Sequence, residues 1–171
     1  REQAGLFDVS HMGEFLVEGP EAAAYLDHLL TNKIANLKHG QMRYSCLCYA
    51  DGGTVDDLIV YRFDDEHFLC VVNASNKQKD WEWFNQNCHH DVKLRNVSSL
   101  ISQVALQGPK AIEILGKLAD LSGGFDELSE ERVATHDLGM VLPVGKRDGV
   151  AHELENVRLA AHGRQLILRS E

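Results

Sequence analysis

A turn signal between two apolar runs constrains this chain more than any other feature of its sequence. Asp51-Gly52-Gly53 separates residues 42–50 from residues 54–63, and both runs are strand-like. A short glycine-rich connection between two such runs is typical of a β-hairpin. We therefore predict an antiparallel hairpin over residues 42–63, within a sheet that neighbouring segments extend and cover.

The second arm of this hairpin contains two consecutive carboxylates, Asp56 and Asp57, inside its apolar run. A buried carboxylate destabilises a protein strongly unless it is paired or hydrogen-bonded, so we expect the function to depend on these residues. Because side chains alternate along a strand, Asp57 shares one face with Tyr61, and Asp56 points to the opposite face. Bulky apolar residues on both faces predict a central strand that is covered on both sides.

The length of the turn decides which residue lies beside Asp57. A two-residue turn within Asp51-Gly52-Gly53 places Tyr44 opposite Ile59 or Tyr61, and therefore on the face of Asp57. A three-residue turn would reverse this parity and send Tyr44 to the other face. With the two-residue turn, a carboxylate and two tyrosines share one face of the sheet.

Two interpretations of this face stay open on geometry alone. The aromatic rings and the carboxylate suit a flat heteroaromatic ligand with N–H donors, because rings pack on tyrosines and a carboxylate orients an amine. The alternative is that Asp56 and Asp57 cap turns or form ion pairs with Arg43 or Arg62. Without further information, the residues support the two interpretations equally.

Size and charge narrow the class of protein. The 171 residues, 44% hydrophobic and 25% charged, suit one compact domain, with or without a loosely attached tail. No apolar run approaches the roughly 18 residues that a membrane span needs. The net charge of -9 argues against nucleic acid or an anionic membrane surface as the main partner.

The cysteines give no sign of a metal centre. Cys46, Cys48, Cys70 and Cys88 all lie in or beside apolar segments, which is typical of free thiols in a reducing compartment. Their spacing, even together with the histidines after Cys88, matches no standard four-ligand pattern. We therefore predict that the chain has no metal site.

The remaining pattern alternates strands and helices and predicts an α+β fold, an antiparallel sheet with flanking helices. Gly19-Pro20 and Gly108-Pro109 each open a helix, and Ser75 with Gln78 forms a candidate capping box for another. Further strands are expected at residues 13–18, 67–73, 92–97 and 103–107.

One stretch of sequence is echoed later in the chain. Residues 15–22 and residues 104–111 both read as a strand, a Gly-Pro step and the start of an amphipathic helix. Convergent helix-start chemistry explains this echo as well as a duplicated unit does. A duplication would place split β-α-β repeats around the antiparallel sheet.

Four ordered motifs carry a resemblance to a known family, and they lie at residues 8–14, 51–61, 71–76 and 106–111. Together they closely resemble the T-protein of the glycine cleavage system, the tetrahydrofolate-dependent aminomethyltransferase, over roughly residues 1–118. Related folate domains occur in dimethylglycine and sarcosine dehydrogenases and in an iron–sulfur maturation factor. The His11-Met12 pair after Asp8-Val9-Ser10 favours the T-protein branch.

The resemblance implies a reaction and its partners. In this family, tetrahydrofolate lies in a central cavity and accepts the aminomethyl group from the lipoyl arm of H-protein. Ammonia is released and methylenetetrahydrofolate is formed. Lipoylated H-protein would then be the protein partner, and the bacterial cytoplasm or the mitochondrial matrix the compartment.

The resemblance also assigns residues. The family's essential aspartate corresponds to Asp57, and Met12, Tyr44, Tyr61 and Asn73 match positions that line the folate cavity. A carboxylate there can bond the folate amines, position N5 for attack and stabilise a cationic species. Asp56, which faces the other way, is expected to have a structural role.

Departures from the family pattern set the expected domains. We predict a folate-binding domain over residues 1–121, lacking the family's N-terminal segment, and a divergent or truncated tail over residues 122–171. The sequence is expected to begin inside a longer protein. After Leu118 no counterpart of the family's Arg-Thr-Gly-Tyr-Thr-Gly-Glu-Asp-Gly run is found. The alternative function is a folate-binding module without transferase activity, resembling the iron–sulfur maturation branch or an inactive fragment.

Overall fold

The computed structural model describes residues 2–88, 91–115, 117, 139–143, 160–162 and 165–167. The chain divides into two compact units, one of residues His11–Ser99 and one of residues Arg1–Ser10 and Leu100–Glu171. The predicted boundary at residue 121 falls outside the described residues and stays a prediction.

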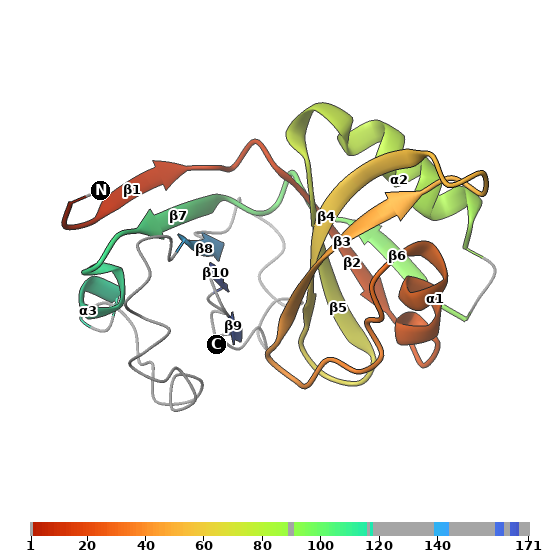
Figure 1. The fold of residues 1–171 in the computed structure, drawn as a ribbon, viewed down its shortest axis with the longest axis horizontal. Coiled ribbons are helices and arrows are strands. Elements are labelled where there is room, and N and C mark those ends of the chain that lie inside the picture. Colours follow the sequence, from red (N-terminus) through yellow and green to blue (C-terminus); the bar gives the residue numbers. More distant parts are fainter. Residues whose placement is uncertain are drawn as a thin grey trace. The chain divides into compact units, whose positions relative to one another are not determined.

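The unit of residues 11–99 is built on a five-stranded antiparallel sheet with the order β3-β4-β5-β2-β6 (Figure 1). Its strands are β2 (Gly13–Glu18), β3 (Met42–Cys48), β4 (Thr54–Arg62), β5 (His67–Val72) and β6 (Lys93–Asn96). Its helices are α1 (Ala22–Leu29), the short 3-10 helix η1 (Ala74–Asn76) and α2 (Lys77–Gln86).

The connection from β5 through α2 to β6 is a split β-α-β unit. Strand β2 lies between β5 and β6 and is antiparallel to both, so β5 and β6 run parallel to each other on either side of it. Strands β3, β4 and β5 form an antiparallel meander beside this unit. The predicted α+β class with an antiparallel sheet and flanking helices is therefore confirmed.

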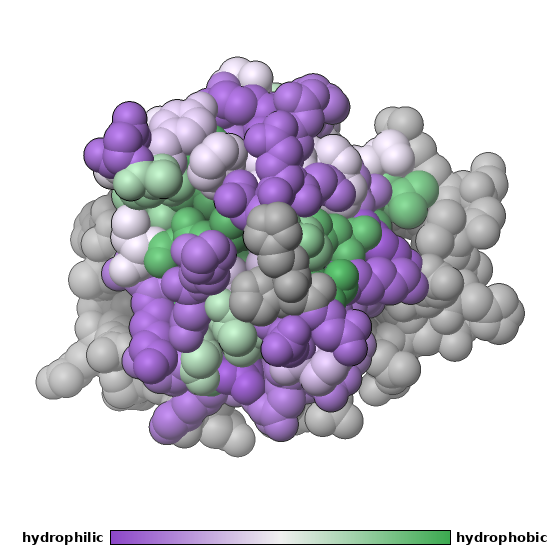
Figure 2. All heavy atoms as spheres, turned by 90° about the vertical axis from the view of Figure 1, so that its right-hand side faces the viewer, coloured by the Kyte–Doolittle hydropathy of each residue, from purple (hydrophilic) through white to green (hydrophobic). Residues whose placement is uncertain are grey.

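The hydrophobic core lies between this sheet and the helices α1 and α2. Phe15 of β2 packs against Trp81 and Phe84 of α2, with ring centroids 5.0 Å and 5.5 Å apart. The buried Tyr25 hydroxyl of α1 donates a 2.6 Å hydrogen bond to the Phe84 carbonyl, which joins the two helices. Figure 2 views the helix-bearing side, where the outer surface is predominantly hydrophilic, as amphipathic helices require.

The two echoed segments adopt the same local structure. In each, a strand is followed by a glycine with positive φ, 126° at Gly19 and 130° at Gly108. In each, the amide three residues later donates back to that glycine's carbonyl, at 3.1 Å for Ala22 and 3.0 Å for Ala111. The sequence echo thus reflects a repeated strand–turn–helix unit.

The other unit contains a three-stranded antiparallel sheet with the order β1-β7-β8. Its elements are β1 (Gly5–Asp8), β7 (Gln103–Gln107), α3 (Ala111–Leu115), β8 (Gly139–Pro143), and a separate pair β9 (Ala160–His162) and β10 (Gln165–Ile167). Ser10 ends the N-terminal segment by bonding Gln103, whose amide donates to the Ser10 hydroxyl over 2.9 Å. Among the described residues, no helix has the length and hydrophobicity to cross a membrane.

Candidate active site

The hairpin turn differs from the predicted two-residue turn. The Gly52 amide donates to the Tyr49 carbonyl over 3.0 Å, and the Tyr49 amide donates to the Gly53 carbonyl over 2.7 Å. Three residues, 50–52, therefore form the loop, and Gly52 supplies the positive φ of 88° that this loop type needs. A turn of this length alone would reverse the face of Tyr44.

A β-bulge restores the predicted parity. The register between β3 and β4 shifts between Leu47 and Cys48, which compensates for the odd length of the loop. Beyond the bulge, Tyr44 pairs with Ile59, and Cys46 pairs with Asp57. Tyr44 thus lies on the face of Asp57, as predicted. The three-residue loop and the bulge together place it there, and not a two-residue turn.

Strand parity separates the two aspartates, as the sequence predicts. Asp56 is only 8% exposed and lies toward the face that carries the core. Asp57 is partly exposed, and the neighbouring Tyr44 is 54% exposed. One carboxylate is therefore enclosed, and the other is accessible beside an accessible aromatic ring.

The side-chain amide of Asn73 connects the two aspartates. Its Nδ2 lies 2.9 Å from Asp56 Oδ1, 3.1 Å from Asp57 Oδ1 and 3.2 Å from the Asp57 carbonyl oxygen. The backbone amide of Asp57 also donates to Asp56 Oδ1, over 2.9 Å. Asn73 directly follows β5, so a neighbouring strand holds the Asp57 side chain in place.

These hydrogen bonds fix the ionisation of Asp56. Burial alone would raise the pKa of Asp56, but hydrogen bonds from the Asn73 amide and the Asp57 backbone hold it below the usual value. At Tyr44, desolvation and then the Asp57 carboxylate raise the pKa, and a hydrogen bond to Asp57 adds to this effect. Tyr44 therefore stays a neutral phenol that can donate to Asp57.

Two further carboxyl groups lie near this site, and the sequence pattern does not predict that they are buried. Glu14 of β2 is 1% exposed and, through the pairs Glu14–Val71 and Val71–Ile59, shares the sheet face of Asp57. Burial raises the pKa of Glu14 to about 8, against a smaller opposing effect of Lys77. Asp80 of α2 is fully buried, and its pKa is raised to about 7, chiefly by burial.

Comparison with known proteins shows the family of this chain. The GCVT N-terminal domain matches residues 1–141. The chain belongs to this family. Aminomethyltransferases of Listeria monocytogenes and Natranaerobius thermophilus are 54% and 51% identical to it over 121 and 120 residues. Both matches cover about 70% of this chain, and the chain spans 33% of either relative.

A solved structure from the same family has a similar fold. The glycine cleavage system aminomethyltransferase T from Bartonella henselae superposes with a TM-score of 0.65 at 38% sequence identity. The match covers 68% of this chain and 32% of that protein. The resemblance that the four sequence motifs indicate is therefore confirmed, and the curated relatives carry the name of a transferase.

The four residues that the resemblance assigns to the folate cavity differ in burial and in their position relative to Asp57. Asn73 bonds Asp57 directly, and Tyr44 lies on the same face of the sheet, two residues along β3 from Cys46, the strand partner of Asp57. Tyr61 has the same strand parity, but its side chain is fully buried, and burial raises its pKa. Met12 is partly buried just before β2, and its carbonyl accepts a 3.4 Å hydrogen bond from Lys77.

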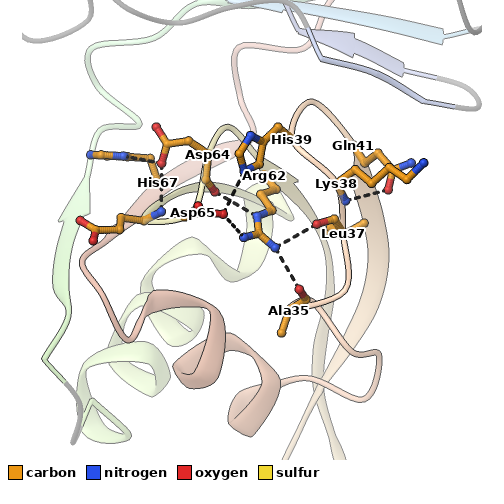
Figure 3. A network of polar contacts seen from close by, with 10 residues as sticks. Ala35, Leu37, Lys38, His39, Gln41, Arg62, Asp64, Asp65 and His67 are labelled. Carbon is orange, nitrogen blue, oxygen red and sulfur yellow. Dashed lines mark hydrogen bonds and ion pairs between the residues drawn. The ribbon is translucent and has the colours of Figure 1, made fainter.

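The alternative that Asp56 and Asp57 pair with Arg43 or Arg62 is wrong. Arg62 donates to the carbonyls of Ala35 and Leu37, both at 2.9 Å, and to Asp65 at 2.7 Å (Figure 3). Arg43 donates to the Lys33 carbonyl and to Asn36 instead. Both arginines therefore hold the loop of residues 31–41 against the sheet. The carboxylates of Asp56 and Asp57 are hydrogen-bonded to Asn73 instead.

The cysteines are free thiols, as predicted. In the part of the chain that the structure describes, no group of histidine, cysteine or acidic side chains is arranged to hold a metal ion. Cys46 lies opposite Asp57 on β3, where it adds a partly buried thiol to the site face.

Proposed function

We propose that this chain forms the tetrahydrofolate-binding part of an aminomethyltransferase of the glycine cleavage system, with Asp57 as its catalytic carboxylate. The observation that carries the proposal is the accessible Asp57 side chain, which Asn73 holds in place beside the exposed ring of Tyr44. Membership of the GCVT N-terminal domain family supports the same conclusion.

The residues of this face fit a reduced folate. The pyrimidine ring of a reduced folate is flat and the ring system carries N–H donors, so it suits a site with an acceptor and an aromatic surface. Asp57 offers a carboxylate oxygen, and Tyr44, a residue that is 54% exposed, offers an aromatic ring. Met12, Tyr61 and Asn73 complete the proposed binding set, with the enclosed Tyr61 supporting the floor of the site.

Asp57 has an electrostatic and a positioning role in this proposal. Its carboxylate accepts N–H hydrogen bonds from the folate amines and orients N5 toward the incoming carbon. A fixed negative charge at this position stabilises the positive charge that develops as the aminomethyl group is transferred. Tyr44, a neutral phenol, donates to Asp57 and limits the motion of the carboxylate. Asp57 does not have to act as a strong base.

The donor and the domain limits are part of the proposal. The lipoyl arm of H-protein supplies the aminomethyl group, and ammonia leaves. Residues 1–121 form the folate-binding domain, and residues 122–171 form the divergent tail. The compartment, either the bacterial cytoplasm or the mitochondrial matrix, stays a prediction. A folate-binding module without transferase activity is the competing function, because the chain spans 33% of its curated relatives.

A turnover assay separates these two functions. The protein is incubated with aminomethyl-loaded H-protein and tetrahydrofolate, and released ammonia is measured. We expect ammonia release that Asp57→Asn lowers by about 100-fold or more, the scale of losing one electrostatic catalytic group. Asp51→Asn, a matched change on the exposed hairpin turn, leaves the rate unchanged. Full activity of Asp57→Asn would overturn its role, and folate binding without any ammonia release would favour the module.

A further inference from the structure

Helix α2 directs a fully enclosed carboxyl group toward the strand that carries the site. Asp80 has no exposed surface, and no donor among the described residues reaches either of its oxygens. On β4, the Oδ2 atom of Asp56 is likewise buried without a donor. Lys79, next to Asp80, donates to the carbonyl of Val55, next to Asp56, so this turn of α2 packs against β4 at Asp56. Each of the two carboxyl groups also shifts the pKa of the other.

Two buried carboxylates cannot satisfy each other, because ionised carboxylates only accept hydrogen bonds. One shared proton removes the conflict, since a protonated carboxyl group donates an O–H to its neighbour. Burial, followed by Asp56, raises the pKa of Asp80 to about 7, whereas hydrogen bonds lower the pKa of Asp56. The proton therefore belongs to Asp80, and Asp56 is the acceptor.

From Asp56 the contacts continue to the site. Asp56 Oδ1 accepts from the Asn73 amide over 2.9 Å, and the same amide nitrogen lies 3.1 Å from Asp57 Oδ1. Asp80, Asp56, Asn73 and Asp57 thus form one connected series from the helix to the accessible face. Asp80 itself has no exposed surface, so it acts on the face of Asp57 only through its neighbours.

We propose that Asp80 is a positioning residue for Asp57, acting through a proton that it shares with Asp56 and through the Asn73 amide. The proposal of a role in folate binding rests on the function proposed above. The positioning itself is a property of this chain and can be observed without folate.

The charges around Asp80 make this arrangement sensitive to pH. Asp56 and Asp57 on β4 are both acidic, and Lys79 on α2 is the cation that opposes them. Lys79 is itself engaged with the Val55 carbonyl. When Asp80 loses its proton, its negative charge repels Asp56, and the Asn73 amide loses its fixed acceptor. We expect Asp57 to become mobile above the pKa of Asp80.

The first test follows the side chains by nuclear magnetic resonance in the full 171-residue chain. Aspartate carboxyl carbons and the Asn73 side-chain amide are recorded between about pH 5 and about pH 9. We expect one aspartate to titrate near pH 7, with the Asn73 amide shifting at the same midpoint. Asp80→Asn, which keeps a donor to Asp56, removes both transitions, and Glu82→Gln on the exposed face of the same helix preserves them.

Two results of this titration would overturn the proposal. One is an Asp80 carboxyl group that titrates at the ordinary value, and the other is an Asn73 amide that does not follow it. Both are read in the unaltered chain, so the test stands even if Asp80→Asn does not fold.

The second test links the positioning to the ligand. Tetrahydrofolate affinity of the unaltered chain is expected to fall by about tenfold as pH rises through the Asp80 transition, the scale of one hydrogen bond to a charged group. The affinity of Asp80→Asn stays constant over the same range. An identical pH profile in both proteins would refute the link. No binding at any pH would refute the proposed function, whereas the titration still decides the positioning.

Discussion

At the scale of single residues, Asn73 determines where the Asp57 carboxylate lies. Its amide nitrogen donates hydrogen bonds to Asp56 Oδ1, Asp57 Oδ1 and the Asp57 carbonyl oxygen, at 2.9, 3.1 and 3.2 Å. No described arginine or lysine side chain bonds Asp57, so the Asn73 amide is the described group that orients it. The site depends on a neutral residue as much as on the charged one.

Removing the Asn73 amide is therefore expected to affect both stability and binding. Asn73→Ala leaves Asp56 Oδ1 with one donor fewer and lowers the free energy of unfolding by about 1–3 kcal/mol. We expect tetrahydrofolate affinity to fall about tenfold, because Asp57 is no longer held in place. Denaturant unfolding and calorimetry measure the two effects. The matched control is Asn85→Ala, which removes an exposed amide on α2; equal effects of both changes would contradict the role of Asn73.

Glu14 gives the chain a pH-dependent stability. Its pKa is about 8 in the folded protein and about 4.5 in the unfolded chain, so the folded state holds the proton more tightly. The resulting stabilisation is complete below pH 4.5 and is lost as pH rises toward 8. Asp80 acts in the same direction up to about pH 7.

Glu14→Gln should remove most of this dependence. We expect the unaltered chain to lose on the order of 2–4 kcal/mol of unfolding free energy between about pH 5 and about pH 8, and the variant to lose clearly less. Denaturant titrations at several pH values measure the slope. Glu82→Gln, an exposed acidic residue of α2, serves as the control. Parallel slopes for the unaltered chain and Glu14→Gln would show that Glu14 is not protonated when buried.

At the scale of secondary structure elements, two glycines with positive φ have different surroundings. A Cβ at Gly19 would lie 2.8 Å from the Asp91 carbonyl oxygen, whereas a Cβ at Gly52 would meet nothing within 4 Å. At both positions the positive φ, 126° at Gly19 and 88° at Gly52, disfavours a residue with a side chain. Only Gly19 adds a clash with backbone, where relief requires movement of the chain.

The two alanine substitutions are thus expected to differ. Gly52→Ala costs about 1–2 kcal/mol of unfolding free energy, the cost of left-handed backbone for an L-residue. Gly19→Ala costs more than that, because the methyl group also displaces the segment before β6. Unfolding curves of the two variants, measured side by side, test this order. A larger loss for Gly52→Ala would contradict the geometry.

Elements of the fold could be predicted where local patterns decide them. The hairpin and the Gly-Pro helix starts follow from alternation and turn residues, whereas the split unit of β5, α2 and β6 depends on long-range strand pairing. The Ser75–Gln78 capping box is wrong, because residues 74–76 form η1 and α2 begins at Lys77 after Asn76. Asn76 makes no side-chain cap hydrogen bond and instead helps to lower the pKa of Asp56 against the effect of burial. Tertiary demands on these side chains outweigh the local capping signal.

The candidate site was predictable only in part for a similar reason. Strand parity separates Asp56 from Asp57, but the register of Tyr44 depends on a three-residue loop and a bulge that cancel each other. Asp80 and Glu14 have the sequence context of ordinary surface acids. Their burial depends on how α2 and β2 pack, and no local pattern of residues encodes it.

At the scale of the whole molecule, the sheet face opposite the helices carries the proposed function. Helices α1 and α2 cover one face with the core, and the opposite face presents Asp57 and Tyr44. The chain spans 33% of its curated relatives, so folate binding is the part of the proposed function that is tested on this chain alone.

Calorimetric titration of tetrahydrofolate into the 171-residue chain tests this function most directly. We predict saturable binding that Asp57→Asn weakens by about tenfold or more, the scale of a lost hydrogen bond to a charged group. Asp51→Asn, which alters an exposed carboxylate on the hairpin turn, leaves the affinity unchanged. Undiminished binding by Asp57→Asn, or no binding by the unaltered chain, would contradict the proposal that this face of the sheet holds folate.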